Sequence, residues 1–360
     1  MSPEGGGRAL VDWGLAERIA MAMGRAGEQP QPPPAEELSL WAGRAIGEVA
    51  EYTRLEPHEP IPEPELVGRD EWVRANLTTF REMGAEIERR LHDSINLPGP
   101  LGAVARTLAG TVAGGELGIV LGYVSRKVLG QYDIVLVGPE RSPRLLYVGP
   151  NLGAAHGRLG GGRAMFVHWV ALHETTHAFQ FASVPWLREH LGGMVEKLLH
   201  GAGLGPDLGE LRDAIGRIVR RPDPRRLAEP LREGGLIQLV AGPEQAKALR
   251  GLQATMSVIE GYAEHVMDAV GEDLDPGYAR LRDALESERR SRNLIDTLFA
   301  RLLGLDVKLR QYELGKRFAD TVAEQSGIEG LNEVWRSPDA LPDGEELEQP
   351  ERWLARVAVG

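Results

Sequence analysis

The sequence contains no cysteine. Disulfide bonds, thiolate zinc sites, iron–sulfur clusters and cysteine nucleophiles are therefore excluded, and any metal ion must be bound by His, Asp or Glu side chains. Basic residues are also scarce relative to acidic ones, because 41 Lys and Arg stand against 53 Asp and Glu and give a net charge of −12. This excess of negative charge disfavours nucleic acid and anionic membranes as partners.

Targeting and membrane-spanning signals are missing as well. The N-terminus has no basic segment followed by a long apolar run, so we expect no signal peptide and a cytoplasmic protein. The most apolar stretch, residues 101–125, is rich in glycine and carries Arg106 and Glu116. A bilayer tolerates such charges poorly, so we predict a buried helix whose glycines allow close neighbours.

The periodicity of apolar residues predicts a mainly α fold with a small β-sheet or hairpin. We expect helices at about 8–24, 36–54, 70–93, 101–128, 163–182, 186–200, 207–220, 243–271, 276–303 and 306–326. Two short β-branched runs, at 132–138 and 144–150, flank the turn sequence PERSP and predict a hairpin or an edge-strand pair. Residues 56–68 form an extended, acidic connection.

A chain of 360 residues can form one large domain or two ordinary ones, and we predict a single domain over 1–360. Its predicted parts are an N-terminal helix with a proline-rich linker (1–34), a helical N-terminal part (35–128), a metal-site core (129–336) and an irregular C-terminal tail (337–360).

The pentad His173-Glu174-Thr175-Thr176-His177 stands in the helix expected at 163–182. Residues four apart lie on the same helix face, so both imidazoles can bind one zinc ion. Glu174, beside the first ligand, can accept a proton from a water molecule next to the metal. This helix is apolar nearly all round and so predicted to be buried. A buried, unpaired carboxylate is costly, and a divalent cation resolves that conflict.

A catalytic zinc needs a third protein ligand. The spacing HExxHxxGxxH fails, because the chain has Gln180 and Ser183 at the two later positions. The segment MSVIEGYAEHVMDAV (256–270) offers an alternative, with an acidic stripe beside an apolar one. We predict Glu260 as the third ligand and Glu264, one turn later, as the acceptor of a ligating histidine's Nδ1–H. A solvated acidic face is the other interpretation of this stripe.

An oxyanion in the transition state would need a donor that stabilises it. Tyr262, His265 and Tyr312 are the candidates for this role or for substrate contact. Each could equally be an ordinary buried or half-buried residue.

Several stretches together resemble a poorly characterised bacterial family of zincin-like metallopeptidases or hydrolases, some linked to biosynthesis of a deazaflavin coenzyme. They are RDEWVRANL (69–77), VLGQYDIVL (128–136), WVALHETTHAFQFASVPWLREHL (169–191), SVIEGYAEHVMDAVG (257–271) and KLRQYELGKRF (308–318). The resemblance implies a zincin-like, gluzincin-type core, with His173, His177 and Glu260 as ligands and Glu174 as the base.

We therefore predict a zinc-dependent hydrolase whose substrate is a peptide or a small molecule, most simply a metallopeptidase. One alternative is a non-catalytic scaffold with structural zinc, although such a site would have no need of Glu174. Another is a small-molecule hydrolase in cofactor biosynthesis.

Overall fold

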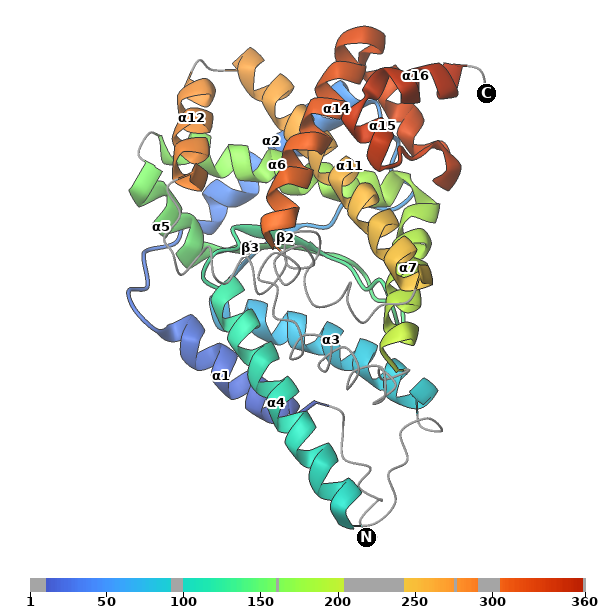
Figure 1. The fold of residues 1–360 in the computed structure, drawn as a ribbon. Helices are drawn as coiled ribbons and strands as arrows, with labels where there is room; N and C mark the ends of the chain where they lie inside the picture. Colours follow the sequence, from blue (N-terminus) through green and yellow to red (C-terminus); the bar gives the residue numbers. More distant parts are fainter. Residues whose placement is uncertain are drawn as a thin grey trace. The chain divides into compact units, whose positions relative to one another are not determined.

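The computed structural model describes residues 11–91, 100–159, 162–203, 243–274, 277–290 and 305–358. Its fold is mainly helical with one three-stranded sheet, as the sequence predicts (Figure 1). The helices are α1 (Trp13–Arg25), α2 (Ala35–Thr53), α3 (Arg69–Leu91), α4 (Pro100–Val124), α5 (Gly149–Leu159), α6 (Arg163–Ser183), α7 (Pro185–Gly203), α11 (Pro243–Leu274), α12 (Gly277–Arg290), α14 (Leu305–Asn332), α15 (Gly344–Glu348) and α16 (Pro350–Ala358). The strands are β1 (Pro64–Val67), β2 (Gly130–Asp133) and β3 (Arg144–Val148).

The chain forms two compact units, and neither is continuous in sequence. The first comprises Met1–Trp41 and Pro62–Val170, and the second comprises Ala42–Ile61 and Ala171–Gly360. The predicted single domain and its internal boundaries stay a prediction. All the predicted metal ligands fall in the second unit.

The sheet of the first unit has the strand order β1-β3-β2. Strand β2 pairs antiparallel with β3, with Tyr132 opposite Leu145, which confirms the predicted pairing. The first strand is shorter and earlier than predicted, because β2 ends at Asp133 and residues 134–138 are not strand. Strand β1 pairs parallel with β3, with Leu66 opposite Tyr147. The central strand β3 is buried from Leu145 to Val148, as its run of apolar residues requires. The sequence predicts only an extended segment where β1 forms, because its pairing partner lies far along the chain.

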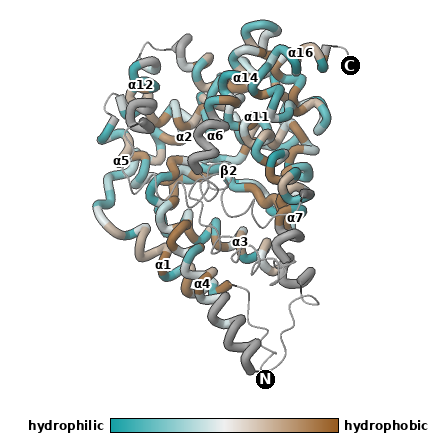
Figure 2. Tube along the Cα trace, viewed as in Figure 1, coloured by the Kyte–Doolittle hydropathy of each residue, from teal (hydrophilic) through white to brown (hydrophobic). Residues whose placement is uncertain are grey.

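Helix α4 packs closely against α1 in the first unit, and both helices carry many hydrophobic residues (Figure 2). Gly118 faces α1 so closely that a Cβ there would lie 2.7 Å from the Ala16 carbonyl oxygen. At Gly122 a Cβ would lie 2.6 Å from the Cβ of Met23. Glycines four residues apart thus let two backbones approach, as predicted. The predicted burial of this helix holds for one face only, because Val112 and Ile119 are 60% and 40% exposed. Among the described helices, none is long and apolar enough to cross a membrane.

Helix α11 lies against α7 and α14 in the second unit. Glycines also permit its crossing with α14, because a Cβ at Gly261 or Gly315 would overlap the backbone of the other helix. The predicted apolar stripe of α11 is buried at Ile259, Ala263 and Val266. The same burial orients the acidic stripe, since both stripes lie on one rigid helix.

The C-terminal tail corrects one prediction. Residues 337–360 were expected to be irregular, but they form the 3₁₀-helix η2 (Pro338–Ala340), α15 and α16. Trp353 is fully buried, donates from Nε1 to the Ala340 carbonyl at 2.7 Å, and packs edge-on against Phe318. The 3₁₀-helix η2 and α15 have only three and five residues, too few for an apolar period, so the packing of Trp353 in the core stabilises this region.

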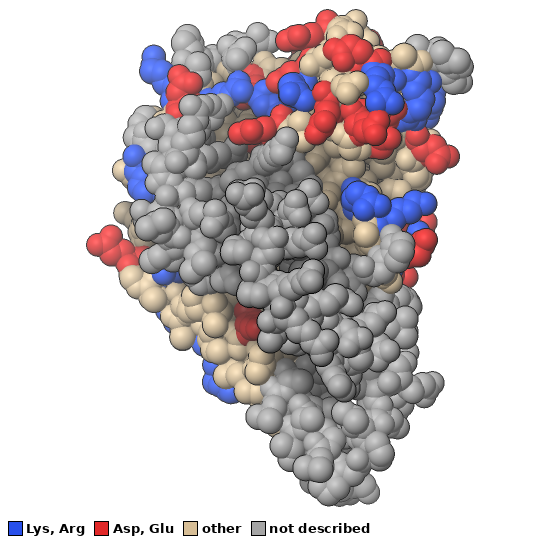
Figure 3. All heavy atoms as spheres, in the orientation of Figure 1, with Lys and Arg blue, Asp and Glu red and all other residues tan. Residues whose placement is uncertain are grey.

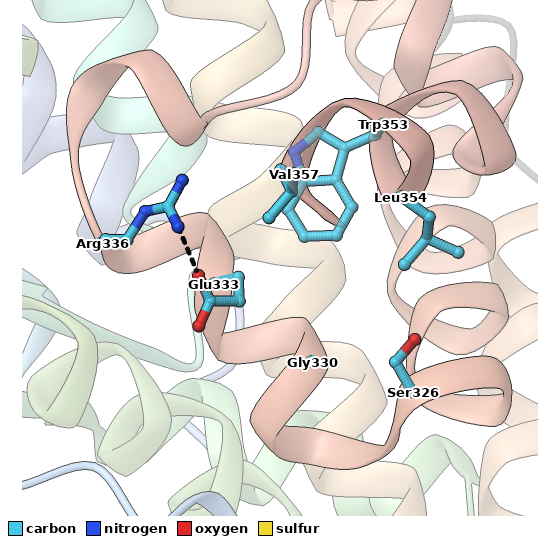
Figure 4. Close-up of a pocket in the computed structure, with 7 residues that line it drawn as sticks. All are labelled: Ser326, Gly330, Glu333, Arg336, Trp353, Leu354 and Val357. Atoms are coloured by element: carbon cyan, nitrogen blue, oxygen red, sulfur yellow. Dashed lines mark ion pairs between the residues drawn. The ribbon is translucent and has the colours of Figure 1, made fainter. Parts of the chain in front are cut away.

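The surface around these C-terminal elements carries acidic and basic side chains next to one another (Figure 3). Arg356 pairs with Glu346, for example, and Arg352 with Glu345. A small hollow of about 360 Å³ lies between the end of α14 and α16 (Figure 4). Trp353 lines it, and an ion pair of 3.2 Å joins Glu333 to Arg336 beside it.

The remaining helix predictions agree with the structure to within a few residues, except in three places. Helix α5 forms at 149–159, where no helix was predicted. The helix predicted at 207–220 lies outside the described residues. The helix predicted at 276–303 is described only as α12, up to Arg290.

Candidate metal centre

Helix α6 carries the pentad on continuous, regular backbone. No proline interrupts it, and Pro185 begins the next helix directly after it ends at Ser183. His173 and His177 are one turn apart, so their rings lie side by side with 3.1 Å between the two Nε2 atoms. Both imidazoles therefore present the same nitrogen to the same point.

Glu260 reaches this point from α11. Its Oε2 lies 3.6 Å from Nε2 of His173 and 3.6 Å from Nε2 of His177. Ligand atoms on a tetrahedral zinc, at about 2.0–2.1 Å from the metal, are about 3.4 Å apart. The three edges of this triangle match that separation. Among the described residues, His173, His177 and Glu260 form a group with ligand atoms close enough to hold one metal ion.

The electrostatics of the group also suit a cation. Burial disfavours a charged His177, but the carboxylates of Glu260 and Glu174 outweigh it and raise the pKa of His177 to about 9. Burial likewise disfavours a charged Glu260, yet the two histidines hold the pKa of Glu260 well below its usual value. The group thus favours positive charge at its centre, which a metal ion can supply.

Glu174 lies beside this group and is buried, with 7% of its surface exposed. Its charge contributes to the raised pKa of His177, which shows that the carboxylate is within electrostatic reach of the ligands. This is the environment in which a carboxylate can serve as a general base. Its assignment as the base stays a prediction.

Gln180 is a site residue that the sequence pattern did not reveal. It is fully buried, and its Oε1 lies 2.9 Å from Nδ1 of His177. Its Nε2 donates to the carbonyl oxygen of Ile259 at 2.9 Å. In the sequence, Gln180 stands out only as a mismatch to the spacing HExxHxxGxxH. The spacing of three residues from His177 was the available signal, since it places Gln180 on the same helix face.

Glu264 lies one turn after Glu260 and is buried, with 9% of its surface exposed. Because Nδ1 of His177 pairs with Gln180, His173 is the histidine that Glu264 would orient. This role of Glu264 stays a prediction.

Tyr262 does not suit the predicted oxyanion role. It is fully buried, its hydroxyl donates to Asn332 Oδ1 at 2.8 Å, and its ring packs edge-on against Trp335. Burial raises the pKa of Tyr262 above its usual value. Asn332 in turn donates to the carbonyl of Thr53 at 2.8 Å. The hydroxyl therefore links core elements of the second unit, and we drop it as a candidate.

His265 does not suit that role either, because both ring nitrogens have partners. Nε2 lies 2.8 Å from the Tyr52 hydroxyl, and Nδ1 lies 2.9 Å from Asp320 Oδ1. The side chain of Tyr312, the third candidate, lies outside the described residues.

A larger cavity of about 840 Å³ lies along the N-terminal half of α11 and beside α7. Gln253 and Ser257 line it from α11, and Lys197 lines it from α7. None of His173, His177 and Glu260 lines it, so it is separate from the metal-binding group.

A family model of zincin-like metallopeptidases matches residues 11–354. The chain is 27% identical to a candidate hydrolase with a novel fold from Chloroflexus aurantiacus, known from a crystal structure. That similarity has a TM-score of 0.68 and covers 97% of this chain and 99% of the other. The comparison with curated proteins finds no match. These findings confirm the predicted family resemblance.

Proposed function

Because the chain belongs to the family of zincin-like metallopeptidases, we propose that it is a zinc-dependent hydrolase that cleaves a peptide bond. The observation that carries the proposal is the triangle of His173, His177 and Glu260, with edges of 3.1, 3.6 and 3.6 Å. A set of two imidazoles and one carboxylate is typical of catalytic zinc and leaves one position open.

In this proposal His173, His177 and Glu260 hold the metal. Zinc, when bound, would polarise the scissile carbonyl and make a water molecule more acidic. Glu174 accepts a proton from the attacking water and then delivers it to the leaving amine. Its burial supports this role, because a carboxylate shielded from bulk solvent is held in place beside a water molecule next to the metal.

Two alternatives from the sequence are kept as outcomes of the test. A non-catalytic scaffold would keep the zinc and the three ligands but would not depend on Glu174. A hydrolase of a small cofactor precursor would need Glu174 but would leave peptides intact. The buried carboxylate favours catalysis over the scaffold, since a structural zinc has no use for a second acidic group that is not a ligand.

The test is Glu174→Gln in the full chain, assayed for zinc content and for cleavage of a peptide library. The amide keeps the shape but cannot accept the proton. We expect one zinc per chain to remain while turnover falls roughly 10²–10⁴-fold. Glu189→Gln is the matched control, because Glu189 is exposed on the neighbouring helix α7 and should leave turnover unchanged.

Equal turnover in wild type and Glu174→Gln would remove Glu174 from the mechanism. Zinc-loaded wild type that cleaves no peptide in the library would overturn the assignment as a peptidase.

A further inference from the structure

Gln180 connects the two helices that supply the metal ligands. Its side chain leaves α6 one turn after His177, and its amide nitrogen reaches the backbone of α11 at Ile259, the residue before Glu260. The two hydrogen bonds measure 2.9 Å each, and the side chain is fully buried. One residue therefore contacts a ligand on one helix and the backbone beside a ligand on the other.

The backbone carbonyl determines which way the amide is turned. The carbonyl oxygen of Ile259 can only accept a hydrogen bond, so the NH₂ group of Gln180 must face it. The amide oxygen then faces His177, and this oxygen can only accept. Nδ1 of His177 must therefore carry the hydrogen. The lone pair of the neutral ring is left on Nε2, the atom that lies 3.6 Å from Glu260.

We propose that Gln180 is a positioning residue of the metal centre, one that selects the zinc-binding tautomer of His177 and holds α11 in register at Glu260. This inference rests on the proposed zinc site. Gln180 itself touches neither metal nor substrate. It acts because rotation of the His177 ring would break one hydrogen bond, and a shift of α11 would break the other.

The neutral amide of Gln180 also determines how strongly the Nδ1 proton of His177 is attracted. A carboxylate at this position would pull the Nδ1 proton more strongly and make the imidazole a stronger electron donor. It would face the carbonyl of Ile259 without a hydrogen to donate, so it would support the histidine and repel α11. Glutamine is the side chain of this length that serves both partners at once.

The experiment compares Gln180→Met with Gln180→Glu in the full chain. Gln180→Met keeps the volume and removes both hydrogen bonds, so zinc should bind roughly 10–100-fold more weakly in chelator competition. Gln180→Glu keeps the acceptor for His177 but loses the donor to Ile259, so its zinc affinity should lie between those of wild type and Gln180→Met. The second readout is ¹⁵N NMR of the zinc-loaded protein. The Nδ1–H of His177 should exchange slowly in wild type and Gln180→Glu, and rapidly in Gln180→Met.

Thr176→Val is the matched control. Thr176 is fully buried on the same helix, and its hydroxyl donates to the Leu172 carbonyl at 2.7 Å. Its loss should lower stability as any buried hydrogen bond does, yet leave zinc affinity and the His177 signal unchanged.

Wild-type zinc affinity and a protected Nδ1–H in Gln180→Met would overturn the proposal. Equal zinc loss in Thr176→Val would also overturn it, because the effect would then be general destabilisation. Neither readout depends on hydrolysis, so a failed peptidase assay would leave this result intact. If Gln180→Met does not fold, a rapidly exchanging Nδ1–H in Gln180→Glu contradicts the tautomer argument, and wild-type zinc affinity in Gln180→Glu contradicts the role of Gln180 in holding α11.

Discussion

Helix α11 carries two buried clusters of ionisable side chains, and they balance their charges in different ways. The first is the metal-binding group of His173, His177 and Glu260. The second, which we term the α11–α14 network, consists of Tyr52, His265, Asp268, Arg282, Lys316 and Asp320. Both contain histidine, and both take a carboxylate from α11.

The α11–α14 network has its own permanent cations. Lys316 lies 2.6 Å from Asp320 and 3.0 Å from Asp268, and Arg282 lies 2.8 Å from Asp268. Burial opposes the charge on Lys316, but its hydrogen bond to Asp320 and the charge of Asp268 raise the pKa of Lys316 above its usual value. This network is complete without any ligand.

Among the residues that the structure describes, no lysine or arginine pairs with the metal-binding group. Within the described part of the chain, the ion pairs of Glu260 are made to His173 and His177. Imidazoles become cations only by taking up protons, so the positive charge must come from solvent or from a metal ion. The comparison teaches that one helix can contribute carboxylates to two kinds of cluster, a structural network where lysine and arginine are the partners, and a candidate metal site where two imidazoles are the partners.

The largest expected difference between substitutions in the two clusters is in the zinc content of the protein. His177→Ala removes a ligand and should leave the purified protein without stoichiometric zinc by elemental analysis. His265→Ala removes the corresponding histidine of the α11–α14 network and should keep one zinc per chain. Full zinc in His177→Ala, or loss of zinc in His265→Ala, would contradict the assignment of the two clusters.

The next effect separates the acidic residues along α11. Glu260→Ala should abolish tight zinc binding, because it removes a bond to the metal. Glu264→Ala should weaken binding roughly 10–100-fold, as expected for a carboxylate that only orients a ligand. Asp268→Ala should leave affinity unchanged, since Asp268 belongs to the α11–α14 network. Chelator competition at fixed pH measures all three, and a reversed order of Glu260 and Glu264 would exchange their roles.

A smaller effect is expected when the α11–α14 network loses its lysine. Lys316→Met leaves Asp268 and Asp320 short of a partner and should lower the free energy of unfolding by roughly 1–3 kcal/mol, with zinc affinity unchanged. Urea denaturation measures the loss. Lys247→Met is the control, because Lys247 is exposed on α11 and should change stability by less than about 0.5 kcal/mol. Weakened zinc binding in Lys316→Met would show that the two clusters are coupled.

The smallest expected effect is on the stability of the protein at acidic pH. Burial would raise the pKa of Asp320, but hydrogen bonds from His265 and Lys316 outweigh it and lower that pKa. The stability that Asp320 contributes is therefore present above its ordinary pKa of about 4 and lost as the pH falls through the lowered value. Urea denaturation of wild type and Asp320→Asn should give a difference that is constant near pH 5 and shrinks below about pH 4. A stability difference that grows as the pH falls would contradict the lowered pKa of Asp320.

The sequence by itself determined the features that depend on local spacing. The i, i+4 histidines and the adjacent Glu174 followed from helix periodicity, as did most helices and the paired strands β2 and β3. Glu260 could be singled out as an acidic residue of a helical stripe, but local periodicity does not distinguish it from Glu264 or Asp268.

Only the tertiary structure decided which acidic residue faces which partner. Lys316 and Arg282 neutralise Asp268, whereas Glu260 meets the two histidines, because α14 and α6 approach α11 from different sides. The hydrogen bond from Gln180 to Ile259 also depends on the tertiary structure, because the two residues are 79 positions apart in the chain. Strand β1 forms because it pairs with the distant strand β3. The tail is helical because Trp353 is buried in the core. Each of these features depends on contacts between segments far apart in sequence, and local pattern carries no information about them.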